Sequence, residues 1–107
     1  MEIGQYQIVL VNLDPTKGSE IKKTRLCVVI SPDEMNDHLQ TIIIAPMTTV
    51  SKPYPTRVKV RHNKTDGWVV LDQIRTIDRK RVTRSYDRLT SKEISKVKAV
   101  ISEAYVA

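Results

Sequence analysis

The residues of this chain that could do chemistry lie in two short polar segments, each beside an apolar run. Arg25 directly precedes the apolar run of residues 26–30, and Thr48 and Thr49 directly follow the run that ends at Met47. An arginine held at a strand end can bind a phosphate through two parallel hydrogen bonds, and a threonine hydroxyl can add another. The other interpretation is an exposed loop arginine and two threonines that simply favour a strand.

The composition leaves few other routes to catalysis. Two histidines and one cysteine, without an HExxH or CxxC pattern, are too few natural ligands for a zinc site, so we expect no metal and no cofactor. The three glycines form no phosphate-binding loop, and no nucleophile elbow is present. His38 and His62 lie in polar, loop-like contexts and are interpreted as surface histidines. Any chemistry must therefore use arginine, hydroxyl groups and carboxylates.

The net charge of +6 is unevenly distributed along the chain. Residues 1–51 hold four Lys and Arg against six Asp and Glu (−2), whereas residues 52–107 hold fourteen against six (+8). This asymmetry indicates a polyanionic partner for one face of the molecule. A basic surface that only keeps the protein soluble explains the charge equally well, so charge alone does not decide.

The length of 107 residues and hydrophobic content of 40% predict a single domain, residues 1–107, with a small core. Domains of this size often gain burial by pairing with a copy of themselves. No run approaches the roughly 20 apolar residues of a membrane helix, and the first fourteen residues lack the pattern of a signal peptide. Cys27 is interpreted as a buried thiol. We therefore expect a cytoplasmic protein with no membrane contact.

Apolar patterning predicts five or six short strands closed into a barrel. The strands are expected at residues 5–13, 26–30, 41–47, 57–61, 68–77 and 81–86. Ser31-Pro32 and the two acidic residues after them predict a short helix with Ser31 as its N-cap. The two prolines at 53 and 55 predict an extended loop, and Asp66-Gly67 predicts a hairpin turn.

Only the C-terminal segment has a clearly helical pattern. Residues 90–93 (TSKE) form a capping-box sequence, and apolar residues recur after it at helical spacing, namely Ile94, Val97, Ile101, Ala104 and Tyr105. The predicted fold class is therefore mainly β, with a C-terminal helix packed on a small barrel.

Three blocks of the sequence resemble the MazF/PemK toxin family, in the family's order and spacing. They are residues 13–20 (LDPTKGSE) with Thr24-Arg25 leading into 28–32, residues 46–49 (PMTT), and residues 71–78 (LDQIRTID). Each block alone is weak, but with the strand pattern they cover nearly the whole chain. The resemblance implies the toxin of a type II toxin–antitoxin system, with a small SH3-like barrel of five to six or seven strands and short helices.

The resemblance also implies an activity and partners. The activity is that of an mRNA interferase, a sequence-selective, metal-independent endoribonuclease that cleaves single-stranded RNA. The implied partners are a second copy in a homodimer and a cognate antitoxin that binds through an acidic and apolar extended segment. The basic residues Arg79, Lys80, Arg81, Arg84 and Arg88 could hold either the RNA or such an antitoxin.

Carried over by position, the resemblance implies that Arg25 and Thr48 are catalytic and that Glu20 is the candidate general base. Asp72 and Gln73 match the family's Asp-Gln pair, whose role is partly structural. The residues expected at the RNA, from the resemblance and from their charge or planar side chains, are Lys17, Thr49, Lys52, Tyr54, Arg57, Asp72, Gln73 and Arg79. Trp68 is expected in the core or a dimer interface instead.

The sequence departs from the family pattern at two places. Residues 23–26 (KTRL) stand where the family usually has Gly-x-Arg-Pro, which alters how Arg25 enters its strand. Val70 stands where some members have an arginine two residues before the Asp-Gln pair, which speaks against a mechanism that needs a second arginine.

The expected reaction uses the 2′-hydroxyl of the RNA as nucleophile and gives 2′,3′-cyclic phosphate and 5′-hydroxyl ends. Arg25 is expected to bind the scissile phosphate, although arginine is a poor proton donor. Two alternatives stay open at this point. One is a non-catalytic toxin of related fold that binds DNA gyrase, and the other is a degenerate toxin that only binds its antitoxin.

Overall fold

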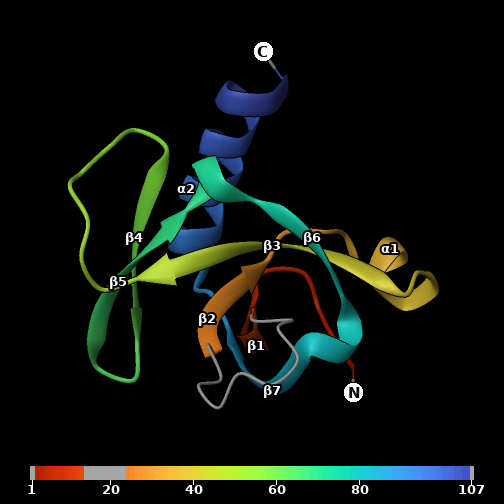
Figure 1. Cartoon of the computed structure of the whole chain (residues 1–107). Helices are drawn as coiled ribbons and strands as arrows, with labels where there is room; N and C mark the ends of the chain where they lie inside the picture. The colour runs from red at the N-terminus through yellow and green to blue at the C-terminus, as the bar shows by residue number, and fades with distance from the viewer. Residues whose placement is uncertain (1, 14–23, 107) are drawn as a thin grey trace.

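The computed structural model describes residues 2–13 and 24–106 of the chain. In these residues, seven strands form one antiparallel sheet: β1 (Gln7–Asn12), β2 (Thr24–Val29), β3 (Thr41–Thr48), β4 (Arg57–His62), β5 (Thr65–Val70), β6 (Arg75–Asp78) and β7 (Val82–Arg88). The strand order is β4-β5-β3-β2-β1-β7, and β6 also pairs with β3. The sheet curls into a half-barrel, with the β4–β5 hairpin and helix α1 (Asp33–His38) at opposite sides (Figure 1). The predicted mainly-β barrel with a C-terminal helix is confirmed.

Both faces of the central strands are buried, which explains their continuous apolar runs. Alternate residues of β1 and β2 enter two different hydrophobic clusters: Ile8 and Val28 enter one, while Val9, Cys27 and Val29 enter the other. Cys27 is fully buried, as predicted. Burial raises the pKa of its thiol to about 12, although the nearby Arg25 and Arg75 act in the opposite direction.

The strand predicted at residues 68–77 is two strands, and that prediction was wrong. Thr48 pairs with Trp68 and Ile44 pairs with Arg75, so four steps along β3 correspond to seven steps along its partner segment. The three additional residues form a 3-10 turn, η1 (Leu71–Gln73), that leaves the sheet. Leu71 is buried in the core, whereas the Asp72 side chain bonds to Thr56, just before β4. The alternation of buried and exposed side chains along the strand therefore ends here.

The hairpin turn predicted at Asp66-Gly67 is also misplaced. Both residues lie inside β5, and the turn is made by Asn63 and Lys64, which have φ values of 49° and 63°. Asparagine tolerates this left-handed backbone, so Asn63 was the turn signal. A Cβ placed at Gly67 would lie 3.4 Å from the carbonyl oxygen of Thr48, which is van der Waals contact. Gly67 thus lies where β5 approaches the end of β3.

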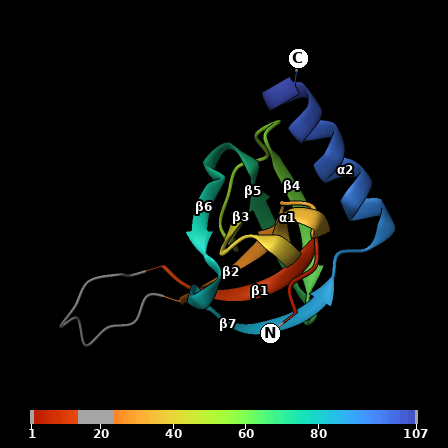
Figure 2. The same ribbon diagram turned by 90° about the vertical axis from the view of Figure 1, so that its right-hand side faces the viewer.

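The predicted capping box at the start of helix α2 (Ser91–Ile101) is confirmed. The Thr90 hydroxyl accepts from the Glu93 amide at 3.2 Å, and Glu93 Oε1 accepts from the Thr90 amide at 2.9 Å. The second Glu93 oxygen accepts from the Arg61 amide at 2.8 Å, which ties the helix to β4. Figure 2 shows α2 running alongside β4, where Val97 is fully buried. Beyond α2, a π-helical turn (Ser102–Val106) carries the half-exposed Tyr105.

The short helix predicted near residue 31 forms as α1, but its N-cap differs from the prediction. The N-cap residue is Pro32, with no side-chain cap, because the Ser31 hydroxyl is used elsewhere. It hydrogen-bonds the Asn36 side chain at 2.5 Å and accepts from the Ile43 amide at 3.0 Å, and both Ser31 and Asn36 are buried. Among the described residues, no helix has the length and apolar character needed to cross a bilayer.

Candidate functional site

A cleft with a volume of about 300 Å³ opens where β2 begins, β3 ends and the β4–β5 hairpin turns back. Two of its residues are the predicted catalytic pair. The side chains and backbone that line it belong to Arg25, Leu26, Met47, Thr48, Thr49, His62, Thr65, Asp66 and Gly67. The cleft therefore joins two sequence segments that were singled out for their chemistry to a third that was not.

Strand register brings Arg25 and Thr48 together. β2 and β3 pair with Cys27 opposite Pro46 and Val28 opposite Ala45, and extending this register by two residues places Arg25 opposite Thr48. Directly opposed residues of antiparallel strands project from the same face. Arg25 is exposed, and its guanidinium has no hydrogen-bond or ion-pair partner among the residues that the structure describes. It is available for an anionic ligand.

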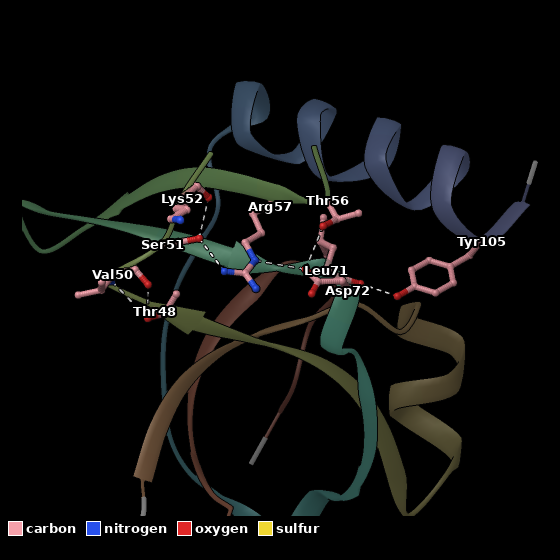
Figure 3. A network of polar contacts seen from close by, with 9 residues as sticks. All are labelled: Thr48, Val50, Ser51, Lys52, Thr56, Arg57, Leu71, Asp72 and Tyr105. Carbon is pink, nitrogen blue, oxygen red and sulfur yellow. Dashed lines mark hydrogen bonds and ion pairs between the residues drawn. The ribbon is translucent and has the colours of Figure 1, made fainter. Parts of the chain in front are cut away.

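The Thr48 side chain is already oriented by the turn that ends β3. Its hydroxyl donates to the Val50 carbonyl at 3.1 Å and accepts from the Val50 amide at 3.3 Å (Figure 3). A hydroxyl has one proton and two lone pairs, so it can still accept one more hydrogen bond. To donate to a phosphate oxygen, it must rotate away from the Val50 carbonyl. Thr49 lies beside it and is exposed.

Arg57 and Asp72 form a second polar cluster, which fixes the loop between β3 and β4. Arg57 donates from Nε to Asp72 Oδ1 at 3.4 Å and from a terminal nitrogen to the Ser51 hydroxyl at 2.8 Å (Figure 3). Its guanidinium carbon also lies 4.9 Å from the centre of the Tyr54 ring. Thr56 donates to the same Asp72 oxygen at 3.0 Å. Arg57 is thus engaged within the loop, whereas Arg25 has no partner in the part of the chain that the structure describes.

The carboxylate of Asp72 is the acceptor at the centre of this cluster. Its partial burial raises the pKa, but the hydrogen bonds from Arg57 and Thr56 outweigh that effect, and the pKa of Asp72 is lower than that of an ordinary aspartate. Tyr105 reaches the same turn from the other side, because its hydroxyl donates to the Leu71 carbonyl at 2.6 Å (Figure 3). The C-terminus and the β3–β4 loop are therefore both attached to η1.

The other predicted RNA-binding residues are dispersed. Lys52, Tyr54 and Gln73 are exposed, the first two on the β3–β4 loop and the third on η1. Arg79 lies away from the cleft and donates to the carbonyls of Asn36 and Leu39 at 2.5 and 3.2 Å, so that it closes the C-terminal end of α1. Lys17 and Glu20 lie outside the described residues.

Sequence reasoning missed His62, which had been interpreted as a surface histidine. It is half-buried, lines the cleft, and packs the edge of its ring against Tyr86, with ring centres 5.0 Å apart and planes at 74°. Period-two alternation contains the signal, because Val58 and Val60 are the buried residues of β4 and His62 is next on that face. The predicted strand ended at Arg61, one residue too early, so His62 was not recognised as part of the buried face.

Asp66 is the second missed cleft residue. Its carboxylate lies 3.8 Å from the Lys59 ammonium across the hairpin, and both side chains are mostly exposed. Such a pair contributes little stability. Among the described residues, no three or more of the types His, Cys, Asp and Glu are grouped as metal ligands.

Comparison with known proteins places this architecture in a family. A family model described as "PemK-like, MazF-like toxin of type II toxin-antitoxin system" matches residues 4–105. This chain belongs to the PemK/MazF toxin family. The resemblance read from residues 13–32, 46–49 and 71–78 is thereby confirmed.

Individual relatives agree with that assignment. The Endoribonuclease toxin MazF of Escherichia coli K12 is 34% identical over 96 residues, which cover 89% of this chain and 86% of the relative. The Endoribonuclease MazF of Staphylococcus saprophyticus is 32% identical over 100 residues, which cover 88% of this chain and 83% of the relative. In the crystal structure of MazE-MazF from Deinococcus radiodurans, a chain that is 24% identical superposes with a TM-score of 0.82, covering 96% of this chain and 95% of that one. The last comparison supports the PemK/MazF fold.

Proposed function

We propose that this chain is the toxin of a type II toxin–antitoxin pair and that it acts in the cytoplasm as an endoribonuclease on single-stranded RNA. The observation that carries the proposal is the cleft that Arg25 and Thr48 both line, from the neighbouring strands β2 and β3. Family membership and relatives named as endoribonucleases support the same activity. The +8 balance of residues 52–107 suits a polyanionic substrate.

The proposed reaction is a transphosphorylation. The 2′-oxygen of one nucleotide forms a bond to the adjacent phosphorus, the bond from phosphorus to the 5′-oxygen of the next nucleotide breaks, and a 2′,3′-cyclic phosphate results. Negative charge grows on the phosphoryl oxygens during this exchange. A guanidinium stabilises that charge with donors in a fixed fork, which is the role we assign to Arg25.

Thr48 has a supporting role in this proposal. Because its hydroxyl is held by the Val50 backbone, it presents a defined acceptor toward the substrate 2′-hydroxyl, or a donor to a phosphate oxygen after rotation. Glu20 remains the proposed general base, five residues before Arg25 in the chain and outside the described residues. No metal ion is required in this scheme, since the substrate supplies the nucleophile.

The RNA is proposed to continue from the cleft along the β3–β4 loop. Thr49 and Lys52 lead away from Thr48, and the exposed ring of Tyr54 can stack on a base. Arg57 and Asp72 are assigned an indirect role, which is to hold this loop in shape. Gln73 and Lys17 complete the proposed contact set, whereas one terminal nitrogen of Arg79 is bonded at α1, away from the cleft, so we assign Arg79 a contribution to the field of positive charge.

The proposed partners are a second copy of the chain and a cognate antitoxin. A solved structure of similar fold is an endoribonuclease in complex with its cognate antitoxin from a mycobacterial species. An acidic and apolar segment suits a surface that carries both basic residues, such as Arg84 and Arg88 of β7, and exposed apolar side chains, such as Val50 and Tyr105. RNA and antitoxin would then compete for the same positive surface.

The proposal is tested by mapping the ends that the purified protein leaves on a mixed RNA. Cuts within single-stranded segments, with 2′,3′-cyclic phosphate and 5′-hydroxyl ends and unchanged yield in EDTA, are the expected result. Loss of cleavage in EDTA with recovery on adding Mg²⁺ would contradict the mechanism. Gyrase-dependent DNA damage without RNA cleavage would overturn the function itself.

A further inference from the structure

We propose that His62 is a catalytic residue of this cleft, the general acid that protonates the departing 5′-oxygen. This inference rests on the proposed function and completes it, because the assigned residues leave the leaving group without a suitable proton source. Nothing in the sequence resemblance assigns a role to this position. The residues that line the cleft, and their ability to give up a proton, lead to His62.

The proton donor is the open part of the mechanism. An alkoxide leaves poorly unless a proton reaches it as the bond to phosphorus breaks, and positioned proton donors typically accelerate such steps by about 10²–10⁴-fold. Arginine holds its proton far too tightly to be an efficient donor near neutral pH. The position where some family members have a second arginine is Val70 in this chain, which is buried at 4% exposure and carries no proton to give.

Among the described residues that line the cleft, only three have ionisable side chains: Arg25, His62 and Asp66. A carboxylic acid is ordinarily ionised at neutral pH and has no proton to deliver. Histidine is the side-chain type that ordinarily changes charge between pH 5 and 8, so it can both give a proton and recover it from solvent. Among these three described residues, His62 is the group that can act as the acid.

The placement of His62 also suits the role. Arg25 and Thr48 come from β2 and β3, whereas His62 reaches the cleft from the end of β4, on the hairpin that forms the other part of the lining. Its half-buried ring is held edge-on against Tyr86 of β7, which limits its freedom to turn. A phosphate bound by Arg25 would thus lie in the same cleft as the imidazole.

The charged and titratable groups around His62 come from four elements. Arg25 of β2 and Asp66 of β5 share the cleft with it, and they act on the imidazolium with opposite signs. From β7, Tyr86 contacts the ring and Arg84 lies 5.5 Å from the Tyr86 ring centre. From α2, Glu93 accepts from the Arg61 amide, next to His62 in the chain.

In the proposed step, one proton leaves the 2′-hydroxyl and another reaches the 5′-oxygen. The 2′-hydroxyl gives its proton to the base, and its oxygen forms a bond to phosphorus. The bond between phosphorus and the 5′-oxygen of the next nucleotide breaks. A ring nitrogen of the imidazolium gives its proton to that 5′-oxygen, which leaves as a hydroxyl group. His62 ends neutral and is reprotonated from solvent before the next cycle.

The first test is the dependence of the single-turnover cleavage rate on pH. Because the acid must be protonated, the wild-type rate should fall as pH rises from 6 to 8.5. His62→Gln should cut on the order of a hundredfold more slowly at pH 6 and lose this fall. His62→Phe keeps a ring against Tyr86 but has no proton, and it should behave as His62→Gln does, provided that thermal unfolding shows both variants to be folded.

The matched control is His38→Gln, which removes the other histidine of the chain, an exposed residue at the end of α1. It should leave both the rate and its pH dependence unchanged. A wild-type rate without a fall above pH 6, or a folded His62 variant with the wild-type profile, would overturn the assignment.

The second test identifies the step. In an RNA whose scissile 5′-oxygen is replaced by sulfur, the leaving thiolate needs no proton. His62→Gln should therefore cleave this RNA within a few-fold of the wild-type rate, while Arg25→Ala stays slow on it because phosphate binding is still lost. If His62→Gln remains equally impaired on the sulfur substrate, His62 does not act on the leaving group and the proposal fails.

These outcomes separate the inference from the function on which it rests. Wild-type protein that cuts RNA, together with His62 variants that cut it equally well, removes only the role of His62. Wild-type protein that does not cut RNA at all removes the proposed function and this inference together.

Discussion

Arg25 and Thr48 differ in how their polar atoms are used before any substrate arrives. The Arg25 guanidinium has no partner among the described residues, whereas both bonds of the Thr48 hydroxyl run to the Val50 backbone. An unpaired exposed guanidinium can bind an anion without first losing an internal bond. The Thr48 hydroxyl is instead fixed in direction, so we expect it to orient the substrate more than to stabilise negative charge.

Substitutions at Thr48 test that distinction. Thr48→Val removes the hydroxyl at nearly constant volume, and we expect RNA cleavage to slow on the order of a hundredfold. Thr48→Ser retains a hydroxyl that can make the same two bonds to Val50, so its rate should stay within a few-fold of wild type. Equal rates for the Val and Ser variants, measured on a single-site RNA, would show that the hydroxyl has no part in the reaction.

Asp72 provides a residue-scale prediction about pH. Its pKa is lower in the folded protein than in an unfolded chain, so the ionised carboxylate stabilises the fold above its ordinary pKa, and this contribution is lost as pH falls through the lowered value. Asp72→Asn should therefore lower the urea midpoint near pH 7, and the difference from wild type should shrink below about pH 4.

The control for Asp72 is Asp87→Asn on β7, an exposed carboxylate without a hydrogen-bond partner in the part of the chain that the structure describes. It should leave the midpoint nearly unchanged at both pH values. A difference between wild type and Asp72→Asn that stays constant down to pH 3 would show that the Arg57–Asp72 contact does not depend on charge.

At the scale of elements, β3 organises the site. One of its edges pairs with β2 and brings Arg25 opposite Thr48, while it also pairs with β5, which delivers the hairpin that carries His62 and Asp66. Helix α2 then holds β4 in place through Glu93 and the buried Val97. The position of the proposed acid thus depends on a helix that does not line the cleft.

Glu93 tests this connection. Glu93→Ala removes both the capping-box acceptor and the acceptor of the Arg61 amide, and it should lower the free energy of unfolding by about 1 kcal/mol or more. Glu103→Ala, beyond α2, removes an equal charge without either bond and should change stability little. Chemical denaturation of the two variants compares them, and equal stabilities would contradict the assigned tether.

The elements that the sequence predicts correctly have either an uninterrupted apolar pattern or a specific helix cap. The buried runs around Val28 and Ile44 and the capping box at Thr90 form as expected. The errors occur where tertiary contacts overrode local signals: η1 interrupts a strand where Asp72 bonds to Thr56 and Arg57, and Gly67 lies inside β5 beside the end of β3 instead of in a turn.

The site was predictable to a similar extent. Arg25 and Thr48 were predicted from their positions beside apolar runs and from family resemblance, and the structure places both in the lining of one cleft, where their catalytic role stays a prediction. His62 was missed because its side chain enters the cleft only through the pairing of β4 with β5 and the curl of the sheet toward β7. The alternation of β4 indicates which face His62 is on, but the residues that it meets there come from long-range pairing that no local pattern gives.

For the molecule as a whole, charge and shape act together. The basic residues concentrate in residues 52–107, which build β4 to α2, while the cleft opens between this part and the ends of β2 and β3. A polyanion attracted to the basic part is thereby led to the residue that can hold a phosphate. Long-range attraction and local chemistry are thus assigned to different residues.

The single-turnover cleavage rate of folded Arg25→Ala, measured beside wild type on one RNA, tests this account most directly. Lys96→Ala, which removes one positive charge from an exposed position of α2, is the control for overall charge. The account predicts a loss on the order of a hundredfold or more for Arg25→Ala and little change for Lys96→Ala. A folded Arg25→Ala protein that cleaves at the wild-type rate would contradict it.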